Sequence, residues 1–214
     1  MLFDLDGVLI DSEGLQYRAY AEALEPFGAS VTHETYAREW IATGQGPEYA
    51  VKTFGLPITP RQLRERKDPI YRRLLIENAA LMPGAADAVP ALARHYRLAV
   101  ATNSTRGDTE YVLGRFGLLD HFDAIVTREA YARAKPAPDA FLAAARECGA
   151  EPARCVVVED SERGLAAARA AGIRAVAVPN EWTRASDLDG ASRSIASLAE
   201  LTPALVDAVL EAPA

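Results

Sequence analysis

The hydrophobic and polar positions of this 214-residue chain follow two different periods. Residues 2–3 end a short apolar run, and from about residue 82 onward brief β-branched runs alternate with alanine-rich segments at helical spacing. Strand–helix alternation of this length predicts a parallel sheet with right-handed crossovers. We expect strands at 97–101, 124–127, 155–158, 175–178 and near 194–196, and helices at 108–116, 138–148, 162–171 and 201–210.

The stretch between residues 12 and 78 shows only helical spacing. Apolar residues recur every three to four positions from Leu15 to Leu24, until Pro26 and Gly28 end the helix. Further helices are predicted at 32–41, 46–54 and 60–78, separated by turns that contain glycine and proline.

These patterns together predict an α/β fold with two domains. Residues 1–11 and 79–214 would form a Rossmann-like catalytic core with a parallel sheet, and residues 12–78 would form an all-helical cap domain inserted after the first strand. A helical body tethered beside an active end is well placed to act as a lid.

Composition and charge exclude several classes of protein. The net charge of −7 argues against a nucleic-acid partner, which normally requires a basic face. No apolar run approaches the ~20 residues of a membrane span, and the amino terminus lacks a secretory signal, so we expect a cytoplasmic protein with no membrane partner.

Cys148 and Cys155 form no metal or redox motif and are expected to be buried, reduced thiols. Since His33, His95 and His121 are scattered, the carboxylates are the leading candidates for chemistry.

The first candidate site is the tetrapeptide DLDG at residues 4–7. Asp4 and Asp6 would lie on the same side of an extended strand, and Gly7 permits a sharp turn where the strand stops. Ligands bind at the carboxyl ends of strands in open parallel sheets. A calcium loop is excluded because glycine arrives at its fourth position and Val8 stands at its fifth. A capped turn, in which the aspartates satisfy only local amides, remains open.

The same tetrapeptide recurs at residues 187–190. No apolar strand precedes this copy, because the residues upstream of it are 182–186, WTRAS. We therefore expect an exposed turn before a short edge strand, without a role in catalysis.

Polar residues also follow other predicted strands. Thr102 and Asn103 supply hydroxyl and amide donors suited to phosphate oxygens, and Glu159 and Asp160 emerge from a fully apolar run. Lys135 lies between them in sequence, in a loop that neighbouring prolines stiffen. Each has an ordinary alternative: Thr102 and Asp160 could be helix N-caps, and Lys135 could be a solvated charge.

The joint pattern favours a phosphoryl site over these separate alternatives. Carboxylates at neighbouring strand ends repel by roughly 4 kcal/mol per close pair at an intermediate dielectric. Such a cluster requires a cation, and ligation by oxygen alone favours Mg²⁺. Mg²⁺, a lysine and hydroxyl or amide donors together form a clamp for a phosphoryl group.

Four segments of the chain resemble, in order, the motifs of the haloacid dehalogenase superfamily. They are DLDGVLIDSE at 4–13, VATNS at 100–104, AKPAPD at 134–139 and VVEDS at 157–161. The chain is similar to the phosphatase and β-phosphoglucomutase-like branch, which carries a helical cap after the first strand. Only three residues precede Asp4, fewer than the family's first strand usually has, which leaves open whether the amino terminus is complete.

The resemblance implies a role for each matching residue. Asp4 resembles the nucleophile that forms an aspartyl-phosphate, and Asp6 the general acid/base that protonates the leaving oxygen. Asp6 also favours phosphoryl transfer over dehalogenation, since a halide leaves without a proton. The implied Mg²⁺ ligands are Asp4, the backbone carbonyl of Asp6 and Asp160, with Glu159 close by through water, and the implied phosphate clamp is Thr102, Asn103 and Lys135.

The cap segment departs from the mutases of this branch. β-Phosphoglucomutases carry a histidine where this chain has Gln16, and an arginine in the loop that resembles residues 43–48 around Gln45. Lys67 resembles a cap lysine that faces the site, which makes Lys67, Gln16 and Gln45 the candidate substrate contacts. The alternative for Lys67 is one member of a solvated basic face with Arg61, Arg64, Arg66, Arg72 and Arg73.

The sequence thus predicts a Mg²⁺-dependent phosphatase that acts as a monomer on a small phosphorylated metabolite, such as a sugar phosphate. A β-phosphoglucomutase-like mutase is the alternative enzyme. A non-catalytic protein that binds a phosphorylated ligand is the alternative from another class, and the intact acidic and basic motif residues argue against it.

Overall fold

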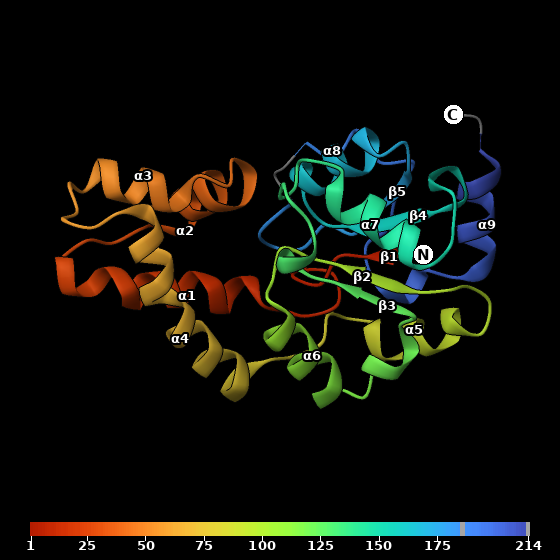
Figure 1. Cartoon of the computed structure of the whole chain (residues 1–214), viewed down its shortest axis with the longest axis horizontal. Coiled ribbons are helices and arrows are strands. Elements are labelled where there is room, and N and C mark those ends of the chain that lie inside the picture. The colour runs from red at the N-terminus through yellow and green to blue at the C-terminus, as the bar shows by residue number, and fades with distance from the viewer. Residues whose placement is uncertain (185–186, 213–214) are drawn as a thin grey trace. The chain divides into compact units, whose positions relative to one another are not determined.

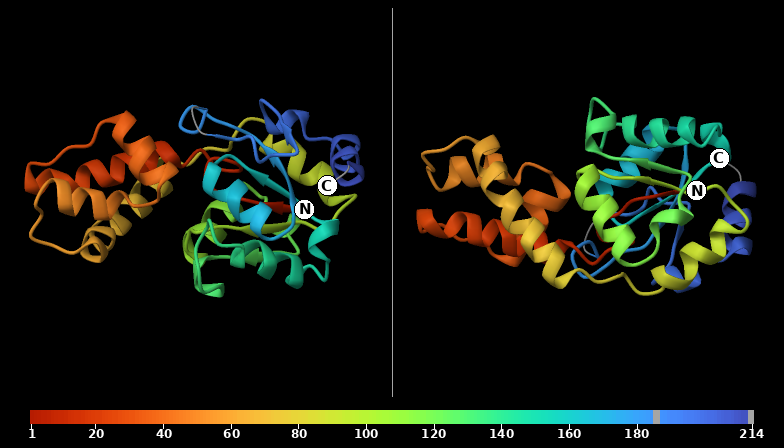
Figure 2. Two further views of the ribbon diagram at one scale, coloured as in Figure 1. Left: turned by 90° about the horizontal axis from the view of Figure 1, so that it is seen from above. Right: turned by 60° about the horizontal axis from the view of Figure 1, so that its bottom comes forward.

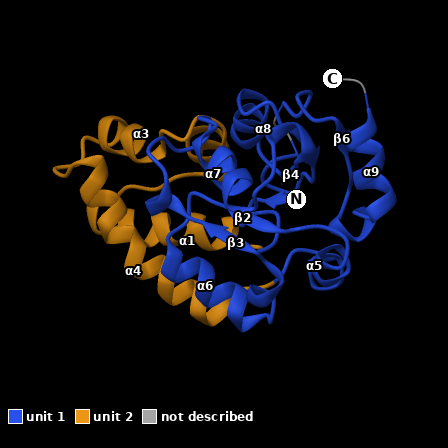
Figure 3. Ribbon diagram, turned by 45° about the vertical axis from the view of Figure 1, so that its right-hand side comes forward, with its two compact units in different colours: residues 1–10, 81–214 blue, residues 11–80 orange. Residues whose placement is uncertain are grey.

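The computed structural model describes residues 1–184 and 187–212 and contains two compact units (Figures 1 and 3). Unit 1 comprises Met1–Ile10 and Leu81–Ala214, and unit 2 comprises Asp11–Ala80. The chain enters unit 2 directly after the first strand and its turn. Each unit has its own buried hydrophobic residues, among them Phe3 and Phe141 in unit 1 and Leu63 and Leu74 in unit 2.

A six-stranded parallel sheet forms the centre of unit 1, with strand order β3-β2-β1-β4-β5-β6. The strands are β1 (Leu2–Phe3), β2 (Ala99–Ala101), β3 (Ala124–Val126), β4 (Val156–Glu159), β5 (Arg174–Ala177) and β6 (Arg193–Ser194). Phe3 of β1 pairs with Val100 on one side and with Val158 on the other. This sheet confirms the predicted α/β class, and its strand order changes direction at β1, where ligands bind in such sheets.

Helices cover both faces of this sheet (Figure 2). They are α5 (Ala85–Ala93), α6 (Arg106–Arg115), α7 (Asp139–Glu147), α8 (Glu162–Ala170) and α9 (Pro203–Glu211). Helices α7 and α8 present mostly alanines to the strands, around the fully buried Phe141. Small side chains allow a helix to approach the sheet closely, which places the first turns of α7 and α8 near the strand ends.

Helix α5 lies outside the helices predicted from the hydrophobic pattern. Pro90 lies inside this helix, and proline ordinarily ends one because it lacks the amide hydrogen. The helix persists because Ala85, Ala88, Val89 and Leu92 are buried together. The other expected strands and helices occur within a few residues of their predicted bounds.

All regular elements of unit 2 are helical. They are α1 (Glu13–Leu24), η1 (Glu25–Phe27), α2 (His33–Tyr36), the π-helix η2 (Ala37–Ala42), α3 (Gly46–Thr53) and α4 (Pro60–Asn78). Helix α4 begins with a capping box, in which the Thr59 side chain accepts from the Gln62 amide and the Gln62 side chain accepts from the Thr59 amide. It packs along α1 and buries Leu63, Leu74 and Leu75.

Several smaller predictions are also confirmed. Cys148 and Cys155 are buried free thiols. In the second DLDG copy, Asp187 and Asp189 are exposed and the Asp187 carboxylate accepts from the Asp189 amide, as expected of a surface turn. Residues 185 and 186, which belong to the segment before it, lie outside the described residues. Across the described part of the chain, no helix combines the length and apolar character needed to span a membrane.

Candidate active site

The site in unit 1 begins where β1 ends. The Asp4 amide donates to the Val158 carbonyl at 3.0 Å, which extends the pairing of β1 with β4 by one residue. Gly7 follows in the left-handed region, with φ at 76°. A Cβ at Gly7 would lie 2.3 Å from Asp160 Oδ2 and 2.7 Å from Asn180 Nδ2, so only glycine allows this close approach. The turn therefore brings the Asp4 segment against the Asp160 segment.

Lys135 lies between two carboxylates and is only 4% exposed. Its Nζ donates to Asp4 Oδ1 and to Glu159 Oε1, at 2.7 Å each. Burial alone lowers the pKa of Lys135, but the Asp4 and Glu159 carboxylates outweigh burial and hold the pKa above its ordinary value. The alternative of a solvated charge is therefore wrong for Lys135, which is a buried, permanently charged group.

The turn after β4 fixes Glu159 in place. Glu159 Oε2 accepts from the amides of Asp160 and Ser161 at 2.9 and 3.0 Å, and from Ser161 Oγ at 2.9 Å. Ser161 is the N-cap of α8, where its side chain accepts from the Gly164 amide, so the N-cap alternative for Asp160 is wrong. Asn180 Nδ2 donates to Asp160 Oδ2 at 2.7 Å and thereby orients that carboxylate.

Three buried carboxylates in this site fit a divalent cation. Asp4, Glu159 and Asp160 each offer an oxygen within 4.8 Å of the others. Burial, together with the nearby Glu159 and Asp6 carboxylates, raises the pKa of Asp4 to about 8 against the opposing effect of Lys135. The lysine thus compensates only part of the negative charge. A donor set of oxygens with excess negative charge suits Mg²⁺. The Asp6 side chain lies outside this cluster, and ligation by its backbone carbonyl stays a prediction.

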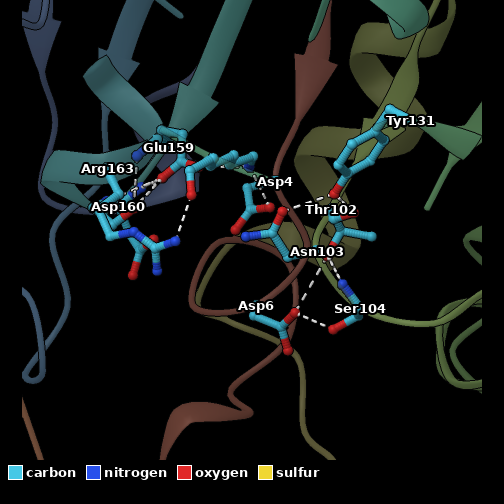
Figure 4. Close-up of polar contacts among 12 residues, drawn as sticks. Asp4, Asp6, Thr102, Asn103, Ser104, Tyr131, Glu159, Asp160 and Arg163 are labelled. Carbon is cyan, nitrogen blue, oxygen red and sulfur yellow. Dashed lines mark hydrogen bonds and ion pairs between the residues drawn. The ribbon is translucent and has the colours of Figure 1, made fainter. Parts of the chain in front are cut away.

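Asp6 is held by hydroxyl groups from the end of β2. Its Oδ2 accepts from Ser104 Oγ at 2.5 Å and from Thr102 Oγ1 at 3.3 Å (Figure 4). Thr102 is fully buried, and its Oγ1 also accepts from the Ser104 amide at 3.0 Å. Thr105, not Thr102, is the N-cap of α6, so the N-cap alternative for Thr102 is wrong.

Asn103 is exposed and is the neighbour of Thr102 in the same turn. Its Oδ1 accepts from the hydroxyl of Tyr131 at 2.7 Å, and Figure 4 shows its amide nitrogen directed toward Asp4. Asn103, in the turn after β2, and Lys135, in the loop before α7, thus both approach Asp4, and their role as a phosphate clamp stays a prediction.

Three further residues that were not predicted from the sequence support this site: Tyr131, Arg163 and Asn180. Asn180 comes shortly after the apolar strand β5, as Asp160 comes after β4. The rule that polar residues after an apolar strand lie at the site could therefore have identified Asn180. No sequence signal marks Tyr131, or Arg163, whose guanidinium donates to the Lys135 carbonyl.

The cap candidates lie in unit 2, where Lys67 is only 9% exposed. Its Nζ donates to Gln16 Oε1 at 3.0 Å and lies 4.9 Å from the ring centre of Tyr71 and 5.5 Å from that of Tyr20. Lys67 is therefore not a member of the solvated basic face. Gln45 is exposed at the N-cap position of α3.

The fold and the acidic site define an α/β protein of the Rossmann-like class whose strand ends suit an anionic ligand and a cation. Residues 1–178 match the family model described as haloacid dehalogenase-like hydrolase. The chain belongs to this family, which confirms the resemblance noted in its motifs.

Individual relatives cover most of the chain. It is 32% identical to the fructose-1-phosphate phosphatase YqaB of Escherichia coli, over 83% of this chain and 95% of that protein. It is also 32% identical to the protein CbbY of Rhodobacter capsulatus, over 100% of this chain and 98% of that one. The crystal structure of CbbY from Rhodobacter sphaeroides with phosphate is 32% identical, covers 96% of this chain and 97% of its own, and superposes with a TM-score of 0.84.

Proposed function

We propose that the protein is a Mg²⁺-dependent phosphatase that hydrolyses a small phosphorylated metabolite, such as a sugar phosphate, through an aspartyl-phosphate. The observation that carries this proposal is Asp4, which is buried at the end of β1 with its Oδ1 2.7 Å from Lys135 Nζ. The names of the relatives support it, since they include phosphatases of fructose 1-phosphate and of hexitol phosphates. One solved CbbY structure, 33% identical with a TM-score of 0.82, contains xylulose 1,5-bisphosphate.

Asp4 and Asp6 divide the chemistry between them. The Asp4 carboxylate attacks phosphorus, the bond from phosphorus to the ester oxygen breaks, and Asp6 delivers a proton to the departing oxygen. Asp6 then takes a proton from the water that attacks the aspartyl-phosphate, which releases phosphate and restores both carboxyl groups.

The remaining residues position the phosphoryl group and balance its charge. Lys135 contributes a fixed positive charge beside Asp4, and the Asn103 amide offers a neutral donor. Asp4, Asp160 and the Asp6 carbonyl would hold Mg²⁺, with Glu159 nearby. Bound Mg²⁺ supplies positive charge toward the phosphate oxygens.

We further propose that unit 2 acts as the cap that selects the substrate, with the domain boundary falling near residues 11 and 80. Its candidates are Lys67, Gln16 and Gln45. Lys67 Nζ lies 3.0 Å from the exposed carboxylate of Asp68, beside the Gln16 amide and two aromatic rings, so an anionic group of the metabolite would take the place of that exposed partner. We favour hydrolysis over mutase activity because Gln16 and the arginine-free loop at 43–48 replace the mutase residues.

The test is the variant Asp4→Asn, assayed with p-nitrophenyl phosphate and Mg²⁺. We expect turnover below about 1% of wild type with an unchanged fold, since the amide cannot form the aspartyl-phosphate. Asp187→Asn, in the exposed copy of the same tetrapeptide, should keep full activity. Substantial hydrolysis by the Asp4 variant would refute the nucleophile, and glucose 6-phosphate formed from glucose 1-phosphate and its bisphosphate would favour a mutase.

A further inference from the structure

Tyr131 lies outside the four motifs but contacts the phosphate clamp. It follows the short helix η4 (Arg128–Ala130), and its ring packs against the buried core of unit 1. Its hydroxyl lies 2.7 Å from the Thr102 carbonyl and 2.7 Å from Asn103 Oδ1 (Figure 4). The Arg128 guanidinium donates to the Tyr131 carbonyl at 2.7 Å and lies 5.2 Å from the ring centre, which holds this residue in place.

The Asn103 side chain has two different ends, and only one of them can help a phosphate. Its amide nitrogen donates hydrogen bonds, whereas its oxygen only accepts them and would repel phosphate oxygens. A hydroxyl donor at Asn103 Oδ1 directs the nitrogen toward Asp4, as Figure 4 shows. The reversed amide would place its oxygen against the Asp4 carboxylate.

The Tyr131 hydroxyl can keep this role because it remains protonated. Burial is the main cause that raises the pKa of Tyr131 to about 12, while the nearby Lys135 lowers this pKa and the nearby Asp4 raises it. Its single proton is shared between the Thr102 carbonyl and Asn103 Oδ1, so the hydroxyl ties the amide orientation to the backbone at the end of β2.

We propose that Tyr131 is a positioning residue that orients the Asn103 amide so that Nδ2 donates to the phosphoryl group of the substrate. The inference rests on the proposed phosphatase function and deepens it. It assigns no chemical step to Tyr131, which acts only through Asn103.

A double-mutant cycle tests the proposal: wild type, Tyr131→Phe, Asn103→Ala and the double variant, with p-nitrophenyl phosphate and Mg²⁺. Tyr131→Phe keeps the buried ring and should lower kcat/KM about tenfold, because the amide loses its preferred orientation. The double variant should be no worse than Asn103→Ala, since Tyr131 then has no amide to orient. The inhibition constant of inorganic phosphate should rise in the same pattern.

Tyr96→Phe is the matched control. The Tyr96 hydroxyl also has two acceptors, the Pro203 carbonyl at 3.1 Å and Asp207 Oδ1 at 2.7 Å, and burial together with the Asp207 carboxylate raises the pKa of Tyr96 to about 12. This variant should retain wild-type kinetics and phosphate inhibition.

Losses that multiply in the double variant would mean that Tyr131 acts structurally, and they would overturn the proposal. Unchanged or tighter phosphate inhibition in Tyr131→Phe would overturn it as well. If the wild type hydrolyses no ester, the proposed function fails, and calorimetric titration of the same four proteins with inorganic phosphate still decides the inference. A wild type that neither turns over nor binds phosphate overturns both.

Discussion

Asp4 and Asp6 are two residues apart, yet their side chains have different partners. Asp4 contacts a buried lysine, whereas Asp6 accepts from the hydroxyls of Ser104 and Thr102. The period-2 argument, by which both would lie on one side of a strand, applies only while the backbone stays extended. Strand β1 ends at Phe3, before either aspartate. The different contacts fit a nucleophile at Asp4 and a proton-transfer group at Asp6.

The role of Asp6 predicts a dependence on the leaving group. In Asp6→Asn, hydrolysis of an alkyl phosphate should slow by about 100-fold or more, because an alkoxide needs a proton as it departs. Hydrolysis of p-nitrophenyl phosphate should slow less than about tenfold, since p-nitrophenolate leaves without one. Steady-state kcat values for both esters provide the measurement. Equal losses would show that Asp6 has a structural or metal-related role and is not the acid.

Helix α8 connects the acidic turn to the core. Gly164 near its start leaves room for the Glu159 side chain. A Cβ at Gly164 would lie 1.8 Å from the carboxyl carbon of Glu159. That carboxylate cannot move freely, because Lys135, Ser161 and the Asp160 amide all donate to it. The start of the helix therefore helps to hold Lys135 beside Asp4.

We predict that Gly164→Ala displaces Glu159 and disturbs Lys135. The variant should lose about 1–3 kcal/mol in its free energy of unfolding and more than about tenfold in kcat. Gly114→Ala in α6 is the control, since a Cβ there would meet no atom within 4 Å apart from its chain neighbours and its own helix backbone. This variant should gain about 0.5–1 kcal/mol in its free energy of unfolding, because alanine has a higher helix propensity than glycine. Urea unfolding and p-nitrophenyl phosphate assays measure both, and a fully active Gly164→Ala would contradict the packing argument.

For the whole chain, the buried acidic cluster predicts that Mg²⁺ stabilises the folded protein. A ligand that binds only the folded state adds about 2.7 kcal/mol to the free energy of unfolding when its concentration is about 100 times its dissociation constant. For a chain of this size, this corresponds to a rise of roughly 5–10 °C in Tm. Chelation should abolish activity and Mg²⁺ should restore it. Asp160→Asn should remove most of the thermal shift, whereas Asp187→Asn should retain it. An identical shift in Asp160→Asn would place the metal elsewhere.

Unit 2 should affect the choice of substrate more than the chemical step. We expect Lys67→Met to raise KM about tenfold for the preferred sugar phosphate, because one charged contact is lost. Turnover of p-nitrophenyl phosphate should change little. Lys52→Met removes an exposed lysine from α3 of the same unit and should leave both substrates unaffected. A phosphorylated-metabolite screen supplies the substrate, and equal effects on both esters would refute the selective role.

Much of the fold could be derived from local pattern. Periods of two and 3.6 residues located the strands and most helices, and parallel strands necessarily bring their carboxyl ends to one edge. The main residues of the site could therefore be grouped from the sequence alone, because each follows an apolar run or lies in a motif between two apolar runs. They are Asp4, Asp6, Thr102, Lys135 and Asp160. Helix α5 was not predicted; it contains Pro90, and burial of its apolar residues outweighs the missing hydrogen bond.

Partners that are distant in sequence depended on the tertiary structure. Neighbouring residues, Thr105 and Ser161, cap the two helices, which leaves Thr102 and Asp160 available to the site. Tyr131 contacts Asn103, 28 positions away in the sequence, because β2 and β3 are adjacent strands. Lys67 is buried because α4, which carries it, packs beside α1. Local periodicity records which face of an element is apolar. It does not record which element packs against that face, and the hydrogen-bond partners of buried polar groups depend on that packing.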